Sequence, residues 1–183
     1  MCLARMVFEW KCDRHPASAR KLSSGRLLNM GDNMITTVYL SSDHAGTELR
    51  QAVASHLADA GYKTVDLGPE DGASVDYPDY GARLAEAMQD DPASRGVAIC
   101  GSGIGISIAV NRFEWVRAAL VGEATAARLC REHNDANVLA LGQRLTGIAV
   151  ALDCVDAFMT TPFEGGRHER RVEKLGKLRS SNN

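Results

Sequence analysis

The sequence lacks the cysteine pattern that a disulfide framework or a structural zinc site requires. Its 183 residues contain five cysteines, an odd number, and no two of them form a Cys-x-x-Cys pair. A strong excess of charge is also absent, because the formal net charge is −2 and the isoelectric point is near 6.2. We therefore expect a reducing cytoplasmic setting and a small-molecule ligand, with no nucleic acid and no membrane as partner.

Aromatic residues are scarce, at 5% of the chain, although 45% of the residues are hydrophobic. A core of this composition is filled mainly by valine, isoleucine, leucine and alanine, which suits packed layers of strands and helices. The length is appropriate for one α/β domain with a substantial core.

Residues 1–33 have no sustained apolar periodicity and no continuous apolar segment of the kind that a secretory signal carries. Six basic residues are accompanied by three acidic ones, which argues against a transit peptide. We predict that this stretch is a disordered or loosely attached N-terminal extension and that residues 34–183 form a single domain. A translation start at Met30 or at Met34 is an alternative explanation of this stretch, because either would leave most of it upstream of the protein.

From Met34 onward, strand-like and helix-like segments alternate along the sequence. Predicted strands cover residues 36–41, 62–66, 96–100, 116–121 and 137–141. Predicted helices cover residues 46–60, 80–88, 106–110, 123–132 and 146–159. This alternation predicts an α/β fold, a Rossmann-like three-layer α/β/α arrangement with a five-stranded parallel sheet. Ligands of such folds bind beyond the carboxyl ends of the strands.

The most informative segment is Val97-Ala-Ile-Cys-Gly-Ser-Gly-Ile-Gly-Ile-Ser107, in which an apolar run ends at Cys100 and a glycine-rich loop follows. Its three glycines leave backbone N–H groups accessible to an anion, and a helix beginning near Ile106 directs its N-terminus toward the same anion. This pattern predicts a nucleophile or base beside a developing negative charge. The alternative is a buried cysteine before a tight turn, but three glycines and a serine within five residues favour the functional interpretation.

Other glycine motifs do not fit this loop. A phosphate-binding P-loop requires glycine and lysine where the chain has Ile106 and Ser107. A dinucleotide-binding fingerprint requires its third glycine at position 106, and the nucleophile elbow of a hydrolase requires glycines in place of Cys100 and Ile104. A thiol phosphatase would have an arginine six residues after the cysteine, again at position 106. These exclusions leave a base or nucleophile that faces an oxyanion.

Chemically active residues follow four of the predicted strands. They are Asp43-His44, Asp76-Tyr77, Cys100-Gly-Ser-Gly103 and Gly142-Gln-Arg144. Structural explanations exist for each, since Asp43 can cap a helix, Tyr77 can pack before Pro78, and Arg144 can be an ordinary surface charge. Because the carboxyl ends of parallel strands share one edge of the sheet, we expect the four segments to converge there as a ligand site.

Five segments together resemble ribose-5-phosphate isomerase type B, over about residues 35–175. They are Ser41-Ser-Asp-His-Ala-Gly46, Ser74-Val-Asp-Tyr-Pro-Asp-Tyr80, Cys100-Gly-Ser-Gly-Ile-Gly-Ile-Ser-Ile-Ala109, His133-Asn-Asp-Ala-Asn-Val-Leu-Ala140 and Glu164-Gly-Gly-Arg-His168. The wider family includes isomerases of allose, galactose and tetrose phosphates. The resemblance implies an aldose–ketose isomerase of the pentose phosphate pathway, which interconverts ribose 5-phosphate and ribulose 5-phosphate through a cis-enediolate.

The same resemblance implies roles for individual residues. Cys100 would be the base, and the helix N-terminus and loop amides would favour its thiolate and then stabilise the enediolate. Ser102 would relay a proton or assist Cys100, and His133 would open the furanose ring. The resemblance assigns substrate binding to Asp43, His44, Tyr77, Gly101, Gly103, Ile104, Gly105, Asn134, Arg144, Arg167, His168 and Arg171.

Within that set, the three arginines are assigned to the phosphate by resemblance. Arg167 and Arg171 are four residues apart, so we expect them to share one face of a C-terminal helix and to converge on an anion. The alternative for this pair is a solvated basic helix.

The resemblance also implies a homodimer or tetramer whose active sites are shared between chains, so that His133 or an arginine comes from the partner. We expect no cofactor and no metal, because no cluster of histidine, aspartate and glutamate has ligand spacing. Two alternatives stay open: an isomerase of allose 6-phosphate or erythrulose 4-phosphate, and a non-catalytic sugar-phosphate-binding module. No role is assigned to Cys2, Cys12, Cys130 and Cys154.

Overall fold

The computed structural model describes residues 35, 37–70 and 73–178, and the expected extension over residues 1–33 lies outside this part of the chain. Within the described part, one sheet has five parallel strands in the order β2-β1-β3-β5-β4. The strands are β1 (Val38–Ser42), β2 (Thr64–Asp66), β3 (Arg95–Cys100), β4 (Ala118–Leu120) and β5 (Val138–Gly142). The five-stranded parallel sheet expected from the sequence is thereby confirmed.

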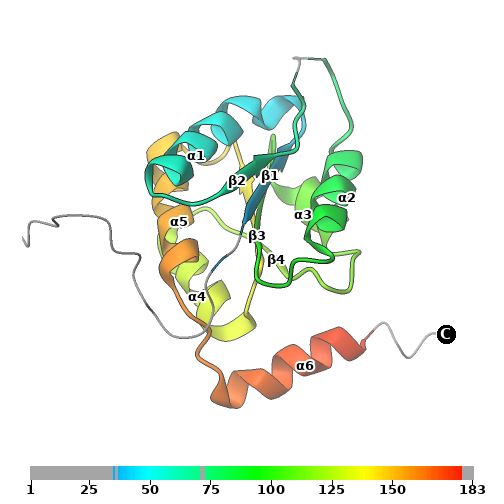
Figure 1. Ribbon diagram of the computed structural model, residues 1–183, viewed down its shortest axis with the longest axis vertical. Helices are drawn as coiled ribbons and strands as arrows, with labels where there is room; N and C mark the ends of the chain where they lie inside the picture. Colours follow the sequence, from blue (N-terminus) through cyan, green and yellow to red (C-terminus); the bar gives the residue numbers. More distant parts are fainter. Residues whose placement is uncertain (1–34, 36, 71–72, 179–183) are drawn as a thin grey trace, which may run out of the picture. The chain divides into compact units, whose positions relative to one another are not determined.

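Helices cover both faces of this sheet, and Figure 1 shows α1 and α5 on one side and α2 and α3 on the other. The helices are α1 (Thr47–Asp59), α2 (Tyr77–Met88), α3 (Ile104–Val110), α4 (Ala124–Asn134), α5 (Ile148–Thr160) and α6 (Glu169–Lys177), with the 3₁₀ turns η1 (His44–Gly46) and η2 (Gly166–His168). One hydrophobic cluster joins α1, α4 and α5 to the sheet, and a second cluster joins α2 and α3 to it. The Rossmann-like three-layer α/β/α arrangement is confirmed.

Strand β3 lies at the centre of the sheet and is buried along its whole length. Successive side chains of a strand point to opposite faces. Val97 and Ile99 accordingly belong to the cluster with α1, α4 and α5, whereas Ala98 and Cys100 belong to the cluster with α2 and α3. This alternation turns Cys100 toward α2 and α3 at the carboxyl end of the strand.

Two helices start earlier than the sequence predicts. Helix α2 begins at Tyr77 rather than at Tyr80, because Pro78 stands in the first turn, where its missing N–H has no partner to lose. Helix α3 begins at Ile104 rather than at Ile106, so the helix starts inside the glycine-rich loop.

The C-terminal segment differs more from its predicted structure than these two helices do. Gly165 and Gly166 both have positive φ, at 66° and 55°, and η2 follows before α6 begins at Glu169. Arg167 therefore lies in a 3₁₀ turn and Arg171 in α6, and the expectation that both share one face of one helix is wrong. In the described part of the chain, the helices are too short or too polar to cross a membrane.

Candidate active site

A cavity of about 390 Å³ opens where β1 and β3 end at the carboxyl edge of the sheet. It is lined by Asp43, His44, Ala45, Tyr77, Cys100, Gly101, Ser102, Gly105, Arg144 and Leu145. Residues from all four sequence-predicted segments therefore meet around one space. Gly103 and Ile104 belong to the same loop, at the start of α3.

Cys100 borders this cavity and is only 4% exposed. The backbone N–H of Gly103 donates a hydrogen bond to Cys100 Sγ, at 3.0 Å. Gly103 has a φ of 75°, and a Cβ there would lie 2.8 Å from the backbone carbonyl carbon of Leu141. Only glycine fits this position, so the path of the loop that presents the N–H to the sulfur depends on it. A hydrogen bond donated to the sulfur stabilises negative charge on it.

The loop after β5 packs on the Cys100 loop. The N–H of Arg144 donates to the carbonyl oxygen of Gly101 at 2.9 Å, and the N–H of Gln143 donates to that of Cys100 at 3.0 Å. A Cβ on Gly101 would lie 3.4 Å from Arg144 Cζ, so the guanidinium lies across this glycine. Ser102 Oγ accepts a hydrogen bond from a backbone N–H two residues further on, at 3.3 Å. A thiol, a hydroxyl and a cation thus border one cavity.

Another part of the cavity lining comes from the start of η1 and from α2. Asp43 is buried, and its Oδ1 accepts a hydrogen bond from the backbone N–H two residues on, at 2.9 Å, so the capping role that the sequence offers as an alternative is present. His44 Nδ1 lies 3.1 Å from the oxygen and 3.2 Å from the nitrogen of Val75, which ties the segment before α2 to η1. The Tyr77 ring covers Gly105, where a Cβ would lie 2.7 Å from a ring carbon.

The remaining sequence-predicted site residues do not line this cavity. They are His133, Asn134, Arg167, His168 and Arg171. His133 and Asn134 end α4, shortly before the amino end of β5, whereas Cys100 pairs with Gly142 at the carboxyl end of β5. The end of α4 lies near the start of β5, and the start and the end of a strand lie at opposite edges of the sheet. The predicted site residues of a single chain therefore form two separate groups.

The second group is centred on two stacked imidazoles. The rings of His133 and His168 are parallel to within 6°, with centroids 4.4 Å apart. Arg167 Nε donates to His168 Nε2 at 3.2 Å, and Glu164 Oε2 lies 3.4 Å from the same nitrogen. Burial, together with His133 and Arg167 nearby, lowers the pKa of His168 below its ordinary value, which favours a neutral imidazole at pH 7.

Sequence reasoning missed Glu164 as part of this group. The ligand atoms of His133, Glu164 and His168 all lie within 4.8 Å of one another. The expectation that histidine and acidic residues form no cluster of ligands is therefore wrong. Glu164 and His168 are four residues apart in the sequence, but His133 lies in another segment, so its approach to them depends on the fold.

Sequence reasoning also missed Asp135, which supports the end of α4 next to His133. It ends α4 in the left-handed conformation, with φ 46°, and its carboxylate joins two arginines. Its Oδ1 lies 2.9 Å from Arg131 Nη1, and its Oδ2 lies 2.7 Å from Arg117 Nη2. These ion pairs hold in place the turn of α4 that carries His133.

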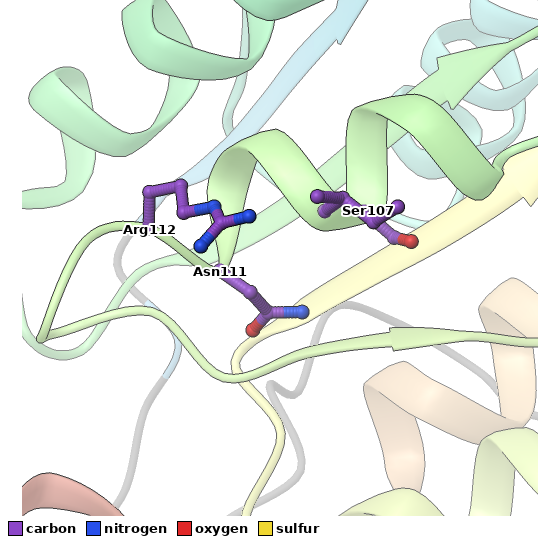
Figure 2. A pocket seen from close by; sticks show the side chains of 4 residues that line it. Ser107, Asn111 and Arg112 are labelled. Atoms are coloured by element: carbon purple, nitrogen blue, oxygen red, sulfur yellow. The ribbon is translucent and has the colours of Figure 1, made fainter. Parts of the chain in front are cut away.

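Two other features lie outside both groups. A hollow of about 240 Å³ on α3 is lined by Ser107, Ile108, Asn111 and Arg112, three of which Figure 2 labels. Its Asn111 amide is engaged with Ala118, donating to the oxygen at 3.0 Å and accepting from the nitrogen at 2.9 Å. Because no thiol, carboxylate or imidazole lines this hollow, we place the candidate active site at the cavity around Cys100.

The thiols of Cys130 and Cys154 belong to the hydrophobic core. Burial raises the pKa of Cys130 to about 11, and burial together with nearby acidic residues raises the pKa of Cys154 above its ordinary value. Both thiols therefore stay protonated at neutral pH and serve in packing.

This α/β domain matches a known class of sugar isomerases. The family model described as ribose/galactose isomerase matches residues 38–175, and the chain belongs to that family. Among curated relatives, the probable ribose-5-phosphate isomerase B of Mycoplasma pneumoniae is 43% identical over 139 residues, which are 75% of this chain and 91% of the relative. Ribose-5-phosphate isomerase B of Escherichia coli K12 is 40% identical over 141 residues, 77% of this chain and 95% of the relative.

Solved structures agree with this assignment. Ribose-5-phosphate isomerase B of Clostridium thermocellum superposes with a TM-score of 0.78 at 44% identity, over 80% of this chain and 99% of that one. The enzyme of the same name from Mycoplasma genitalium, with bound ribulose 5-phosphate, has a TM-score of 0.76 at 36% identity, over 80% of this chain and 97% of that one. The chain is an isomerase of this family.

Proposed function

We propose that this chain interconverts ribose 5-phosphate and ribulose 5-phosphate. The observation that carries the proposal is the Cys100 thiol, which accepts a hydrogen bond from Gly103 N–H beside a 390 Å³ cavity. Membership of the ribose/galactose isomerase family and the ribulose 5-phosphate bound to the Mycoplasma genitalium relative support this substrate. A cavity of this volume suits a small metabolite.

In the proposed reaction, Cys100 in its thiolate form removes the proton from C2 of open-chain ribose 5-phosphate. The electron pair of that C–H bond enters the C1–C2 bond, and the negative charge develops on O1, which gives a cis-enediolate. The thiol returns its proton to C1, while one proton moves from O2 to O1, so the atoms and charge balance. Ser102 Oγ borders the cavity and relays the second proton. General acid–base catalysis of this kind contributes about 10²–10⁴ in rate.

A second copy of the chain completes the site in this proposal. His133 and Arg167 lie at the edge of the sheet away from Cys100, so a homodimer would bring them to the partner's cavity, with a tetramer as a higher assembly. Exposed apolar side chains beside the cavity support this, because Leu145 is 72% exposed and Ile104 is 50% exposed. His133 would then open the furanose ring.

The phosphate is held in this assembly by arginines from both copies. Arg144 borders the cavity of one protomer, and Arg167 and Arg171 of its partner would approach from the second group. Guanidinium groups bind phosphate through paired N–H donors, which positions the anion as well as neutralising it. Asp43 and Asn134 would hold sugar hydroxyls.

We extend the proposal to the pentose phosphate pathway and to a reducing cytoplasm. A thiol base works only while it stays free of disulfides, and a reducing compartment keeps it so. No metal or other cofactor takes part in the proposed reaction.

The test is the interconversion of the two pentose phosphates by purified protein with EDTA present. Cys100→Ala is expected to abolish turnover, and Cys154→Ala, which removes a buried thiol from α5, is expected to retain it. Turnover that survives Cys100→Ala would refute the base assignment. A folded wild type that converts allose 6-phosphate or erythrulose 4-phosphate instead would change the substrate. Phosphate binding without any turnover would favour the non-catalytic binding module.

A further inference from the structure

We propose that His133, Glu164 and His168 form a binding site for a divalent transition-metal ion of the zinc class, and that an ion bound there inhibits the isomerase. The ligand atoms of the three residues lie within 4.8 Å of one another. Two imidazoles and a carboxylate are a set that zinc accepts, with water in the remaining position. The inhibition rests on the proposed function, whereas the binding does not.

The backbone holds the three ligands near one another. His133 lies in the last turn of α4, and Glu164 lies in the segment between α5 and η2. The N–H of Glu164 donates to the carbonyl oxygen of Glu132 at 3.1 Å, which fastens this segment beside His133. The N–H of His168 donates to the carbonyl oxygen of Gly165 at 3.0 Å. An ion therefore meets three ligands that need no rearrangement of the main chain.

Side-chain rotation completes the site. Zinc–nitrogen bonds of about 2.0–2.1 Å put the ligand atoms of a tetrahedral ion about 3.3 Å apart. Glu164 Oε2 already lies 3.4 Å from His168 Nε2, so it is the His133 nitrogen that has to approach the other two ligands. His168 is 4% exposed and stays in place, whereas the Glu164 side chain is 55% exposed and free to turn. The two rings are parallel, so His133 has to rotate until its nitrogen lone pair points at the same ion as that of His168.

Arg167 limits the strength of the site. Its Nε donates to His168 Nε2 at 3.2 Å, and an ion that uses this nitrogen has to displace the guanidinium. The positive charge of Arg167 also opposes a second cation nearby. A partly assembled site in competition with an arginine binds more weakly than a structural zinc centre. Such a site suits reversible inhibition rather than a permanent cofactor.

Occupancy of the site has a direct chemical consequence for the proposed reaction. Ring opening requires a nitrogen of His133 with a lone pair or a proton to exchange, and a bound ion takes that lone pair. Zinc is therefore expected to inhibit turnover of ribose 5-phosphate, and EDTA is expected to reverse the inhibition. EDTA alone is expected to leave the activity unchanged.

Metal binding is tested first, in an experiment that does not depend on enzyme activity. The protein is the full chain with Cys2, Cys12 and Cys100 replaced by serine, and Zn²⁺ is titrated in competition with a chromophoric chelator. Glu164→Gln is expected to weaken binding at least about tenfold, because even changes to residues that only orient the ligands cost about 10–100-fold in metal affinity. His56→Gln is the matched control, since it removes a histidine 2.6 Å from the carboxylate of Asp156 elsewhere on the chain. Equal affinity with and without Glu164→Gln would overturn the site.

Inhibition is then measured with the cysteines restored. Wild type is expected to lose turnover in Zn²⁺, and Glu164→Gln is expected to need at least about tenfold more Zn²⁺ for the same loss. Equal inhibition of both proteins would assign the effect to a thiol such as Cys100 and overturn the inhibitory role. Absence of turnover before zinc is added would refute the proposed function, and the binding titration would still decide the metal site.

Discussion

Replacing Gly103 with alanine is expected to reduce both the stability and the turnover of this chain, because Gly103 combines a left-handed backbone with a hydrogen bond to the thiol. Its φ is 75°, and its N–H donates to Cys100 Sγ at 3.0 Å. Gly61→Ala is the matched control. Gly61 also has positive φ, at 87°, but it lies in the turn between α1 and β2, and a Cβ there would meet nothing within 4 Å.

The size of the effect follows from the two environments. A left-handed conformation costs a non-glycine residue about 1–2 kcal/mol, and this cost applies at both positions. At position 103, a Cβ would also lie 2.8 Å from the backbone of Leu141 and 3.0 Å from the nitrogen of Gly142, so main chain has to move. Overpacking of this kind costs about 1–3 kcal/mol more. We therefore expect the free energy of unfolding to fall by about 1–2 kcal/mol in Gly61→Ala and by about 2–5 kcal/mol in Gly103→Ala.

Turnover separates the two variants further. In the proposed mechanism, moving the loop withdraws the N–H from the sulfur and from the developing enediolate, and loss of one such donor costs about 10²–10³ in kcat. Urea unfolding and initial rates, measured at a temperature where both variants are folded, give the two quantities. A folded Gly103→Ala protein with the kcat of the wild type would refute the reasoning about the loop, and a loss of kcat in Gly61→Ala would show that stability alone explains the effect.

His133→Ala is expected to slow the reaction from ribose 5-phosphate, whose ring must open, more than the reaction from open-chain ribulose 5-phosphate; initial rates that fall equally in both directions would contradict a ring-opening role. Asp135→Asn is expected to lower the free energy of unfolding, measured by urea denaturation, by about 3 kcal/mol, because it removes the carboxylate partner of Arg131, which is 1% exposed. A loss below about 1 kcal/mol would show that the backbone contacts of Arg131 are enough to hold it in place. The pKa of Cys130, raised to about 11 by burial, keeps its thiol protonated in the folded chain while the unfolded chain ionises, so stability falls by up to about 2–3 kcal/mol between pH 9 and pH 11. Cys130→Ala is expected to flatten this pH dependence, and an unchanged slope of unfolding free energy against pH would count against it.

The layers of the fold were predictable because they depend on alternation that a sequence displays directly. The strand predicted at residues 96–100 is β3, Arg95–Cys100, and it lies in the centre of the sheet as its apolar run requires. The boundaries that were wrong depend on single residues. The helix predicted over residues 80–88 begins three residues earlier, at Tyr77, because Pro78 is accommodated in the first turn of α2. Gly165 and Gly166 turn the chain before α6, which a periodic pattern of charges does not reveal.

The cavity was predictable for a similar reason. Asp43, Cys100 and Arg144 follow different strands of one parallel sheet, and a shared edge brings such residues together whatever the details of the loops. The approach of Glu164 to His133 has no equivalent rule. It depends on the return of the segment after α5 to the end of α4, fastened by one backbone hydrogen bond from Glu164 to Glu132. Contacts of this kind become visible only in three dimensions.

The placement of Cys100 and His133 at opposite edges of the sheet has a genetic consequence. In the proposed dimer, a lesion at Cys100 and a lesion at His133 damage different contributions to a shared cavity. A mixed dimer of the two altered chains contains one cavity in which Cys100 of one chain and His133 of the other are both intact. Two such alleles are expected to restore activity to each other when they are expressed together, whereas lesions at Cys100 and Gly103, which affect the same loop, are not expected to complement.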